Sequence, residues 1–185
     1  MDGHVDSYEK LRRLRIPDDM EGASVIDVGT CLGFFLHEFR KRNAGKLVGI
    51  ESNKYNYDLA VEIEENILQS NIEFRNLLYP EEDDKLGDET FDYGLLMAVL
   101  HHMSHPYRVI EKLSKRITNV LICEVIVSGK LGKHKFVLRP KYKDIVPTER
   151  CMEFILGSFF RKVEKVGRSV SPGDDSKRII YKAYK

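Results

Sequence analysis

Apolar runs alternate along the chain with amphipathic segments. The runs that predict strands are 24–28, 46–50, 72–74, 91–98 and 120–127. Because these runs are apolar throughout, we expect strands that are buried on both faces of a parallel sheet. Apolar residues recur at helical spacing over 34–43, 54–70 and 106–116, which predicts helices packed on that sheet. A shorter amphipathic helix is predicted over 6–14, before Pro17.

The end of the chain follows a different pattern. Residues 159–168 and 178–184 read as two strands, and the segment 171–175 between them is too short for a crossover helix. The last two strands should therefore be antiparallel. The predicted fold class is α/β and Rossmann-like, with a mostly parallel sheet, an antiparallel last strand and helices on both faces. The acidic segment 81–84 reads as a solvated loop.

Composition narrows the class of protein without naming a partner. Hydrophobic residues make up 42% and charged residues 32% of the 185 residues, and the formal net charge is +1. The three cysteines show no CxxC spacing, so we expect reduced thiols, no disulfide framework and no metal site. No apolar run approaches the roughly 20 residues that span a bilayer. The polar N-terminal segment does not read as a signal peptide, and we expect a cytoplasmic protein with no membrane partner.

The strongest local motif is the segment 25–35, VIDVGTCLGFF. A strand ends there and turns sharply into a helix, small residues let a ligand approach the backbone, and the helix N-terminus offers free N–H groups. Cys31 stands between Gly29 and Gly33, where it adopts a positive φ less readily than glycine. The alternative is a plain strand–turn–helix that needs two glycines.

A carboxylate follows this turn at a suggestive distance. Glu51 ends the second predicted strand about 20 residues later, where an acid accepts two hydrogen bonds from a ribose diol. Taken alone, such an acid is as often a helix cap or a solvated group. A nicotinamide site would require GxGxxG, and GxCxG stands here, so a dehydrogenase is a weak contender.

Two histidines follow the fourth predicted strand. His101 and His102 lie where that strand opens onto the ligand edge of the sheet. A histidine there can act as a base or a hydrogen-bond donor near neutral pH. The alternative is that one or both only hold the following loop. We take both as candidate catalytic residues.

Together these motifs resemble the class I S-adenosylmethionine (SAM) dependent methyltransferases. The resemblance implies a seven-stranded sheet, SAM as cofactor, and methyl transfer to an oxygen, nitrogen or carbon of a small or nucleotide-like anionic substrate. The family often has an Asp after the third strand that binds adenine, and Asn76 is the candidate here; the alternative is that adenine contacts only backbone and apolar neighbours. The cofactor-binding residues that the resemblance implies are Asp27, Gly29, Cys31, Gly33, Glu51, Asn53, Asn76 and Met97.

The second half of the chain has a narrower resemblance, to the tRNA wobble-uridine methyl- and carboxymethyltransferases that build 5-oxyacetate uridine. The matching segments are 99–106, 121–127, 142–148 and 177–180. This branch usually has a Tyr at the position of His101, and the match implies that Arg178 helps to hold a carboxylated SAM.

A cationic segment supports a polyanionic substrate, with RNA as one possible partner. Its members are Lys130, Lys133, His134, Lys135, Arg139, Lys141 and Lys143. Lys135, Arg139 and Arg178 are the substrate-binding candidates, and we expect His101, this segment and Arg178 to face one cavity. A solvated lysine-rich loop is the alternative.

Three functions stay open: a methyltransferase for a small metabolite, a methyltransferase for RNA, and a non-catalytic SAM-binding module. Fold alone does not choose among them. We expect one domain over 1–185, with a lead-in over 1–22, a cofactor-binding half over 23–127 and a substrate-side segment with the C-terminal hairpin over 128–185.

Overall fold

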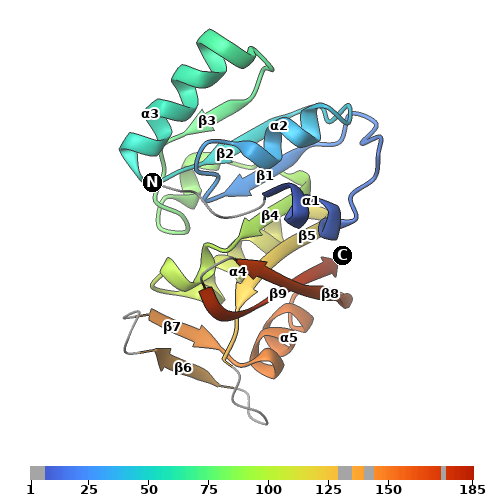
Figure 1. Ribbon diagram of the computed structural model, residues 1–185, viewed down its shortest axis with the longest axis vertical. Helices are drawn as coiled ribbons and strands as arrows, with labels where there is room; N and C mark the ends of the chain where they lie inside the picture. The colour runs from blue at the N-terminus through green and yellow to red at the C-terminus, as the bar shows by residue number, and fades with distance from the viewer. Residues whose placement is uncertain (1–6, 129–134, 140–143, 172–173) are drawn as a thin grey trace.

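The computed structural model describes residues 7–128, 135–139, 144–171 and 174–185. Its seven-stranded sheet has the order β3-β2-β1-β4-β5-β9-β8 (Figure 1). The strands are β1 (Val25–Val28), β2 (Leu47–Ile50), β3 (Glu73–Arg75), β4 (Phe91–Met97), β5 (Ile117–Ile126), β8 (Lys162–Ser171) and β9 (Asp174–Tyr184). The first five strands pair in parallel, and β9 is antiparallel to both β5 and β8. The predicted fold class and C-terminal hairpin are confirmed.

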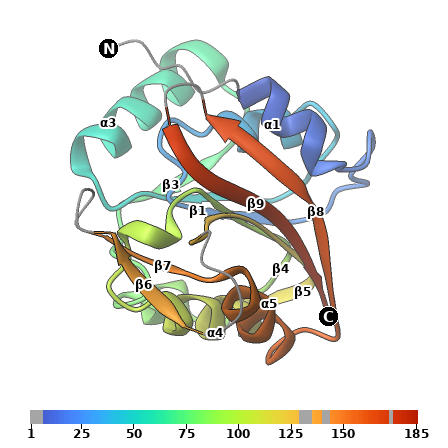
Figure 2. The ribbon, with the colours of Figure 1, turned by 60° about the horizontal axis from the view of Figure 1, so that its bottom comes forward.

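Helices cover both faces of the sheet (Figure 2). On one face lie α1 (Ser7–Leu14), α2 (Phe34–Arg40) and α3 (Lys54–Ile63), and on the other α4 (Pro106–Arg116) and α5 (Glu149–Gly157). Successive side chains of a strand point to opposite faces. Val25 accordingly joins the core under α2, whereas Ile26 and Val28 join the core under α4. None of the helices in the described ranges has the length and apolar character that crossing a bilayer requires.

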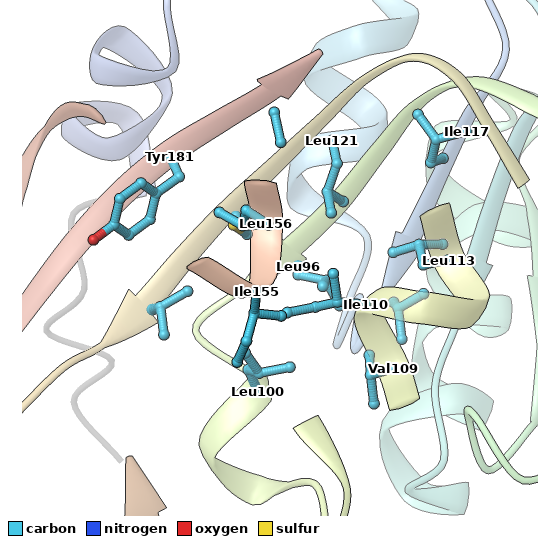
Figure 3. Close-up of a cluster of buried hydrophobic side chains, with 14 of the residues drawn as sticks. Leu96, Leu100, Val109, Ile110, Leu113, Ile117, Leu121, Ile155, Leu156 and Tyr181 are labelled. Atoms are coloured by element: carbon cyan, nitrogen blue, oxygen red, sulfur yellow. The ribbon is translucent and has the colours of Figure 1, made fainter. Parts of the chain in front are cut away.

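The core under α4 and α5 fixes the second half of the sheet (Figure 3). Ile110 of α4 and Ile155 of α5 pack in one cluster with Leu96 of β4 and Leu121 of β5. All four side chains are buried, and each burial stabilises the fold by about 1.5–3 kcal/mol. Both helices therefore pack against the C-terminal end of β4 on the same face of the sheet.

The helix predicted over 54–70 changes its character near the middle. Regular α-helix ends at Ile63, and a π-helical turn, η1 (Glu64–Leu68), follows. The buried Glu64 carboxylate accepts hydrogen bonds from Ser70 Oγ at 2.8 Å and from the Ile72 N–H at 3.1 Å. This carboxylate ties the end of the helix to the start of β3, an effect that apolar periodicity does not reveal.

In the C-terminal half, the sequence patterns did not predict α5, and the bounds of β8 and β9 differ from those of the two predicted strands. The N–H groups of Phe159 and Phe160 donate to the Leu156 carbonyl at 3.1 and 3.0 Å, so this segment closes α5 and β8 begins only at Lys162. The last strand begins earlier than predicted, at Asp174.

The segment 81–84 is not simply a solvated loop. Asp83 begins a 3-10 turn, η2 (Asp83–Leu86), and is partly buried. Its carboxylate accepts a hydrogen bond from Arg116 Nε at 2.6 Å. This ion pair fastens the segment to the C-terminal end of α4.

A separate antiparallel ribbon stands beside the main sheet, formed by β6 (Phe136–Arg139) and β7 (Asp144–Pro147). Val137 pairs with Val146, and Val146 is fully buried. Leu138 pairs with Ile145 on the opposite face of the ribbon, and both of these side chains are largely exposed. One apolar face of the ribbon therefore packs against the protein, and the other apolar face is exposed to solvent.

A buried ion pair fastens α1 to the sheet. Lys10 Nζ donates to Glu124 Oε2 at 2.7 Å, and the two side chains are 8% and 0% exposed. Ser169 Oγ of β8 donates to the other oxygen of the same carboxylate. Glu124 therefore joins three elements, α1, β5 and β8, at one point.

We expect the Lys10–Glu124 pair to show strong coupling in a double-mutant cycle. Removing one partner leaves a buried charge alone, which typically costs about 3–5 kcal/mol. Lys10→Met and Glu124→Met should each destabilise the protein clearly, and the double variant should lose much less than the sum. Urea unfolding of the four proteins measures this.

The matched control is Lys115→Met, which breaks the solvent-exposed pair between Lys115 and Glu111. An exposed pair contributes about 0–1 kcal/mol, so the control should stay close to the parent. Additive losses for Lys10→Met and Glu124→Met would show that the two side chains do not act as a pair.

Candidate active site

The turn after β1 lies against the end of β2. Gly29 and Gly33 both have φ of 78°, and Gly33 is the N-cap residue of α2. The N–H groups of Gly29 and Thr30 donate to the Ile50 carbonyl at 2.8 and 3.1 Å. The turn predicted from the sequence is therefore present, and it is hydrogen-bonded to the neighbouring strand.

Packing explains why glycine occupies two of its positions. A Cβ atom at Gly29 would lie 2.5 Å from Val99 Cγ2, and one at Gly33 would lie 2.6 Å from Phe74 Cζ. Both positions also have the left-handed φ that favours glycine. The glycines thus allow the turn to sit close to the loop after β4 and to β3.

Cys31 takes the same left-handed region without being glycine. Its φ is 53°, a conformation that costs a residue with a Cβ roughly 1–2 kcal/mol. Its side chain is exposed, whereas Cys123 and Cys151 are buried. Partial burial and the nearby negative charge of Glu51 raise the pKa of the Cys31 thiol.

Glu51 connects the turn to the helix that follows β2. Its Oε2 accepts a hydrogen bond from the Cys31 N–H at 2.9 Å, and its Oε1 accepts one from the Asn53 N–H at 2.8 Å. The residue is only 7% exposed. Each carboxylate oxygen has a second lone pair, so both oxygens retain the capacity to accept a ligand hydroxyl.

Asp27 lies in β1, behind the turn. It is 1% exposed, and its Oδ1 has no hydrogen-bond partner within the described residues. Burial is the main cause that raises the pKa of this carboxyl to about 7; the Thr30 side chain opposes the rise, and the negative charge of Glu51 adds to it. Asp27 does not line the cavity described next, so any effect on a ligand there would act through the turn.

A cavity of about 620 Å³ opens at the carboxyl ends of β1, β2 and β4. Of the cofactor-binding residues predicted from the sequence, its walls contain Gly29, Cys31, Glu51, Asn53 and Met97. Ile50 and Leu77 add apolar wall. This set fits SAM, because an acid is available for ribose hydroxyls, apolar side chains for adenine, and a small-residue turn for close backbone approach.

The two predicted asparagines have local roles in the structure. Asn53 Oδ1 accepts a hydrogen bond from the Asn56 N–H at 3.1 Å and thereby caps α3. Asn76 Nδ2 donates to the carbonyls of Glu51 and Ser52 at 2.7 and 3.2 Å. Asn76 therefore supports the loop that carries Glu51, and contact with adenine stays a prediction. Gly33, like Asn76, does not line this cavity.

A second cavity of about 760 Å³ adjoins the first. His102, Met103 and Ser104 line both cavities, and His101 lines the second. The two histidines belong to a 3-10 turn, η3 (Leu100–His102), directly after β4, and their ring centroids are 3.9 Å apart. The structure therefore places His102 where the two cavities meet and His101 beside it in the wall of the second cavity.

The three predicted substrate-binding cations lie elsewhere. Lys135, Arg139 and Arg178 line neither of these two cavities. Arg178 pairs with Ile126 at the carboxyl end of β5, the edge of the sheet that the sequence predicted for it. Contact of these residues with substrate stays a prediction. The other cations of the segment, at positions 130, 133, 134, 141 and 143, lie outside the described residues.

The sequence patterns did not predict the ribbon that forms the apolar side of the second cavity. Phe136 and Ile145 of the ribbon line it together with Tyr107 and Arg108 of α4. The only sign of a strand was the apolar run Phe136–Leu138 before Arg139. Three apolar residues are too few to distinguish a short strand from a loop.

Comparison with known proteins agrees with this geometry. A family profile described as "Methyltransferase domain" matches residues 26–119, just over half of the chain. The N-terminal domain of EvdMO1, crystallised with S-adenosylhomocysteine (SAH) and D-fucose, superposes with a TM-score of 0.74 at 16% identity, covering 100% of this chain and 83% of that one. Magnesium protoporphyrin IX methyltransferase from Synechocystis PCC 6803, with bound SAM, gives 0.74 at 15% identity, covering 99% and 80%.

Two curated relatives match the chain over shorter spans. The mitochondrial ubiquinone biosynthesis O-methyltransferase of Dictyostelium discoideum is 30% identical over 114 residues, which cover 58% of this chain and 36% of that protein. The tRNA U34 carboxymethyltransferase of Campylobacter hominis is 28% identical over 119 residues, which cover 64% and 41%. The chain thus spans less than half the length of these curated relatives. From the family match and the fold, the chain belongs to the SAM-dependent methyltransferase domain family, whose cofactor is SAM.

Proposed function

We propose that the chain binds SAM in the first cavity and transfers its methyl group to an acceptor in the second. The observation that carries this proposal is the Glu51 carboxylate, which is fixed by two backbone N–H groups and still lines the cavity. A carboxylate held in this way is preorganised to accept the two hydroxyl groups of a ribose. The adjoining second cavity gives an acceptor access to the same place.

Methyl transfer requires little of the protein beyond positioning the cofactor and the acceptor. When bound, SAM supplies a methyl group on a cationic sulfur, and transfer leaves SAH, whose sulfur keeps the electron pair of the broken C–S bond. The cavity walls orient the two reactants and exclude water from between them. An acceptor with a hydroxyl or an amine also loses a proton, and His101 and His102 are placed to receive it.

The acceptor that we propose is small and carries an oxygen, nitrogen or carbon nucleophile. Three histidines and Arg108 at the second cavity favour an acceptor that is anionic or becomes so as it loses its proton. Arg178 at the carboxyl end of β5 is an additional candidate contact. Lys135, just before β6, and Arg139, the last residue of β6, are two more.

RNA is a second candidate acceptor, favoured by one specific finding. The curated relative from Campylobacter hominis is named a tRNA U34 carboxymethyltransferase. Many phosphate contacts would make RNA affinity fall steeply as salt is added, because each contact releases counterions. A small acceptor would show only a mild salt effect, so a salt titration separates the two candidates.

The cofactor site is tested by replacing its acid. Glu51→Ala removes charge-assisted hydrogen bonds to the ribose, worth roughly 1.5–3 kcal/mol, so SAH affinity should fall by about 10- to 100-fold. Calorimetric titration with SAH measures this. Glu62→Ala, an exposed glutamate on α3, is the matched control and should bind like the parent.

Glu51 also holds the turn, so thermal unfolding of the same variants is measured alongside. Glu51→Gln keeps one oxygen acceptor and should lie between the parent and Glu51→Ala in SAH affinity. If Glu51→Ala is folded and binds SAH as tightly as the parent, the assignment of Glu51 to the ribose is wrong.

The position of the cofactor is tested through Cys31, which lines the first cavity. SAH should slow the alkylation of Cys31 by iodoacetamide several-fold, because a ligand over the turn covers the thiol. Mass spectrometry of the alkylated protein at pH above 8 gives the rate, since the raised pKa of Cys31 leaves little thiolate at neutral pH.

A cysteine placed far from the cavity is the control. Ile67→Cys in a Cys31→Ser background puts a thiol on the exposed end of η1, and SAH should leave its rate unchanged. An equal rate at Cys31 with and without saturating SAH would mean that the ligand lies elsewhere.

A further inference from the structure

We propose that the second cavity takes an amphipathic acceptor, in which an acidic hydroxyl on an aromatic ring faces His101 and His102 and an apolar substituent lies along the β6–β7 ribbon. The inference rests on the proposed function, because the cavity is the acceptor site only if SAM binds in the first one. It goes further by naming the chemical class of the acceptor.

The ribbon gives the cavity an apolar wall that continues beyond it. Phe136 and Ile145 line the cavity. Leu138 pairs with Ile145, and Phe136 lies two residues before Leu138, so the three side chains share one face of the ribbon. They are 38%, 61% and 52% exposed for Phe136, Leu138 and Ile145. Neighbouring exposed apolar side chains of this size mark a surface that a ligand covers.

The wall contributed by α4 is aromatic. Tyr107 lines the same cavity and is half-exposed, and its ring centroid lies 5.3 Å from that of Phe159. That contact with Phe159 holds the tyrosine ring at the side of the cavity. Aromatic walls of this kind suit a flat ring, because stacked and edge-on ring pairs add about 0.5–1.5 kcal/mol beyond area burial.

The polar end of the cavity lies where it meets the cofactor site. His102 borders both cavities, and its ring lies against that of His101 at an interplanar angle of 43°. A neutral histidine can accept a proton from a phenol-type hydroxyl, whose pKa is about 10. An aliphatic alcohol holds its proton far more tightly, so an aromatic hydroxyl matches this base.

The described lining favours a small acceptor over RNA. Arg108 is the single lysine or arginine among the described residues that line the second cavity. Sequence-independent binding of a nucleic acid uses many phosphate contacts with lysine and arginine. Lys135, Arg139 and Arg178 line neither this cavity nor the first. An apolar substituent on the acceptor, by contrast, would pack directly against the exposed apolar face of the ribbon.

The test uses a homologous series, 4-methylphenol to 4-hexylphenol, titrated into the protein saturated with SAH. Each methylene that the ribbon buries should tighten binding by up to about fourfold, which is the equivalent of 0.8 kcal/mol. Leu138→Ser changes a side chain that lies beyond the cavity lining, so it should flatten this dependence for the longer chains and leave 4-methylphenol nearly unchanged. The Leu138 side chain is 61% exposed, so the variant should fold.

Ile67→Ser is the matched control, because it removes an aliphatic side chain that is 72% exposed on η1, outside both cavities. It should keep the full dependence on chain length. SAH binding is measured separately for every protein, so a failure of the cofactor site is recognised on its own. If the parent protein does not bind SAH, the proposed function is wrong, and this inference fails with it.

Two results would overturn the acceptor class while SAH binding stays intact. The first is an affinity that does not change with chain length, or that changes equally in the parent and in the ribbon variant. The second is tight, salt-sensitive binding of a tRNA anticodon stem-loop that competes with the alkylphenols. A chain-length dependence that only the ribbon variant loses supports the proposal.

Discussion

The site depends on one carboxylate, that of Glu51, which holds two strand ends together. One of its oxygens accepts the N–H of Cys31 in the turn after β1, and the other accepts the N–H of Asn53 at the start of α3. A single side chain therefore supplies the acceptor for two backbone N–H groups on different elements. The distance between the ends of β1 and β2 is thereby fixed, and with it the width of the first cavity.

The rest of the architecture supports that arrangement from behind. Met97, which lines the first cavity, pairs in the sheet with Glu124 of β5. The carboxylate of Glu124 is in turn the anchor for Lys10 of α1 and for Ser169 of β8. Helix α1 and the β8–β9 hairpin are therefore attached to the sheet next to Met97, the end of β4 that lines the first cavity.

The sequence predicted the fold well, because its strands and helices have strong apolar patterns. The turn at Gly29, the acid at Glu51 and the histidines after β4 were also visible, since each has a local chemical signature. The ribbon was not, because Val146 is buried only through tertiary contacts and the strands are four residues each. The local role of Asn76 was equally hidden: its amide donates to carbonyls 24 and 25 residues away in the chain.

The two cavities are built from different kinds of element, and this difference suits them to different ligands. The first combines a fixed carboxylate with a turn that allows close approach, which suits a cofactor shared by a whole family. The second is built from a 3-10 turn, one side of α4 and the ribbon, elements that can vary without disturbing the sheet. Specificity for the acceptor should therefore reside in the second cavity.

The most direct test of the central claim is a crystal structure of the protein with SAH. The account predicts that both ribose hydroxyls lie within hydrogen-bond distance of the Glu51 carboxylate and that the sulfur faces the place where His102 separates the two cavities. SAH bound away from the Gly29–Gly33 turn, or with its ribose not in contact with Glu51, would contradict the account.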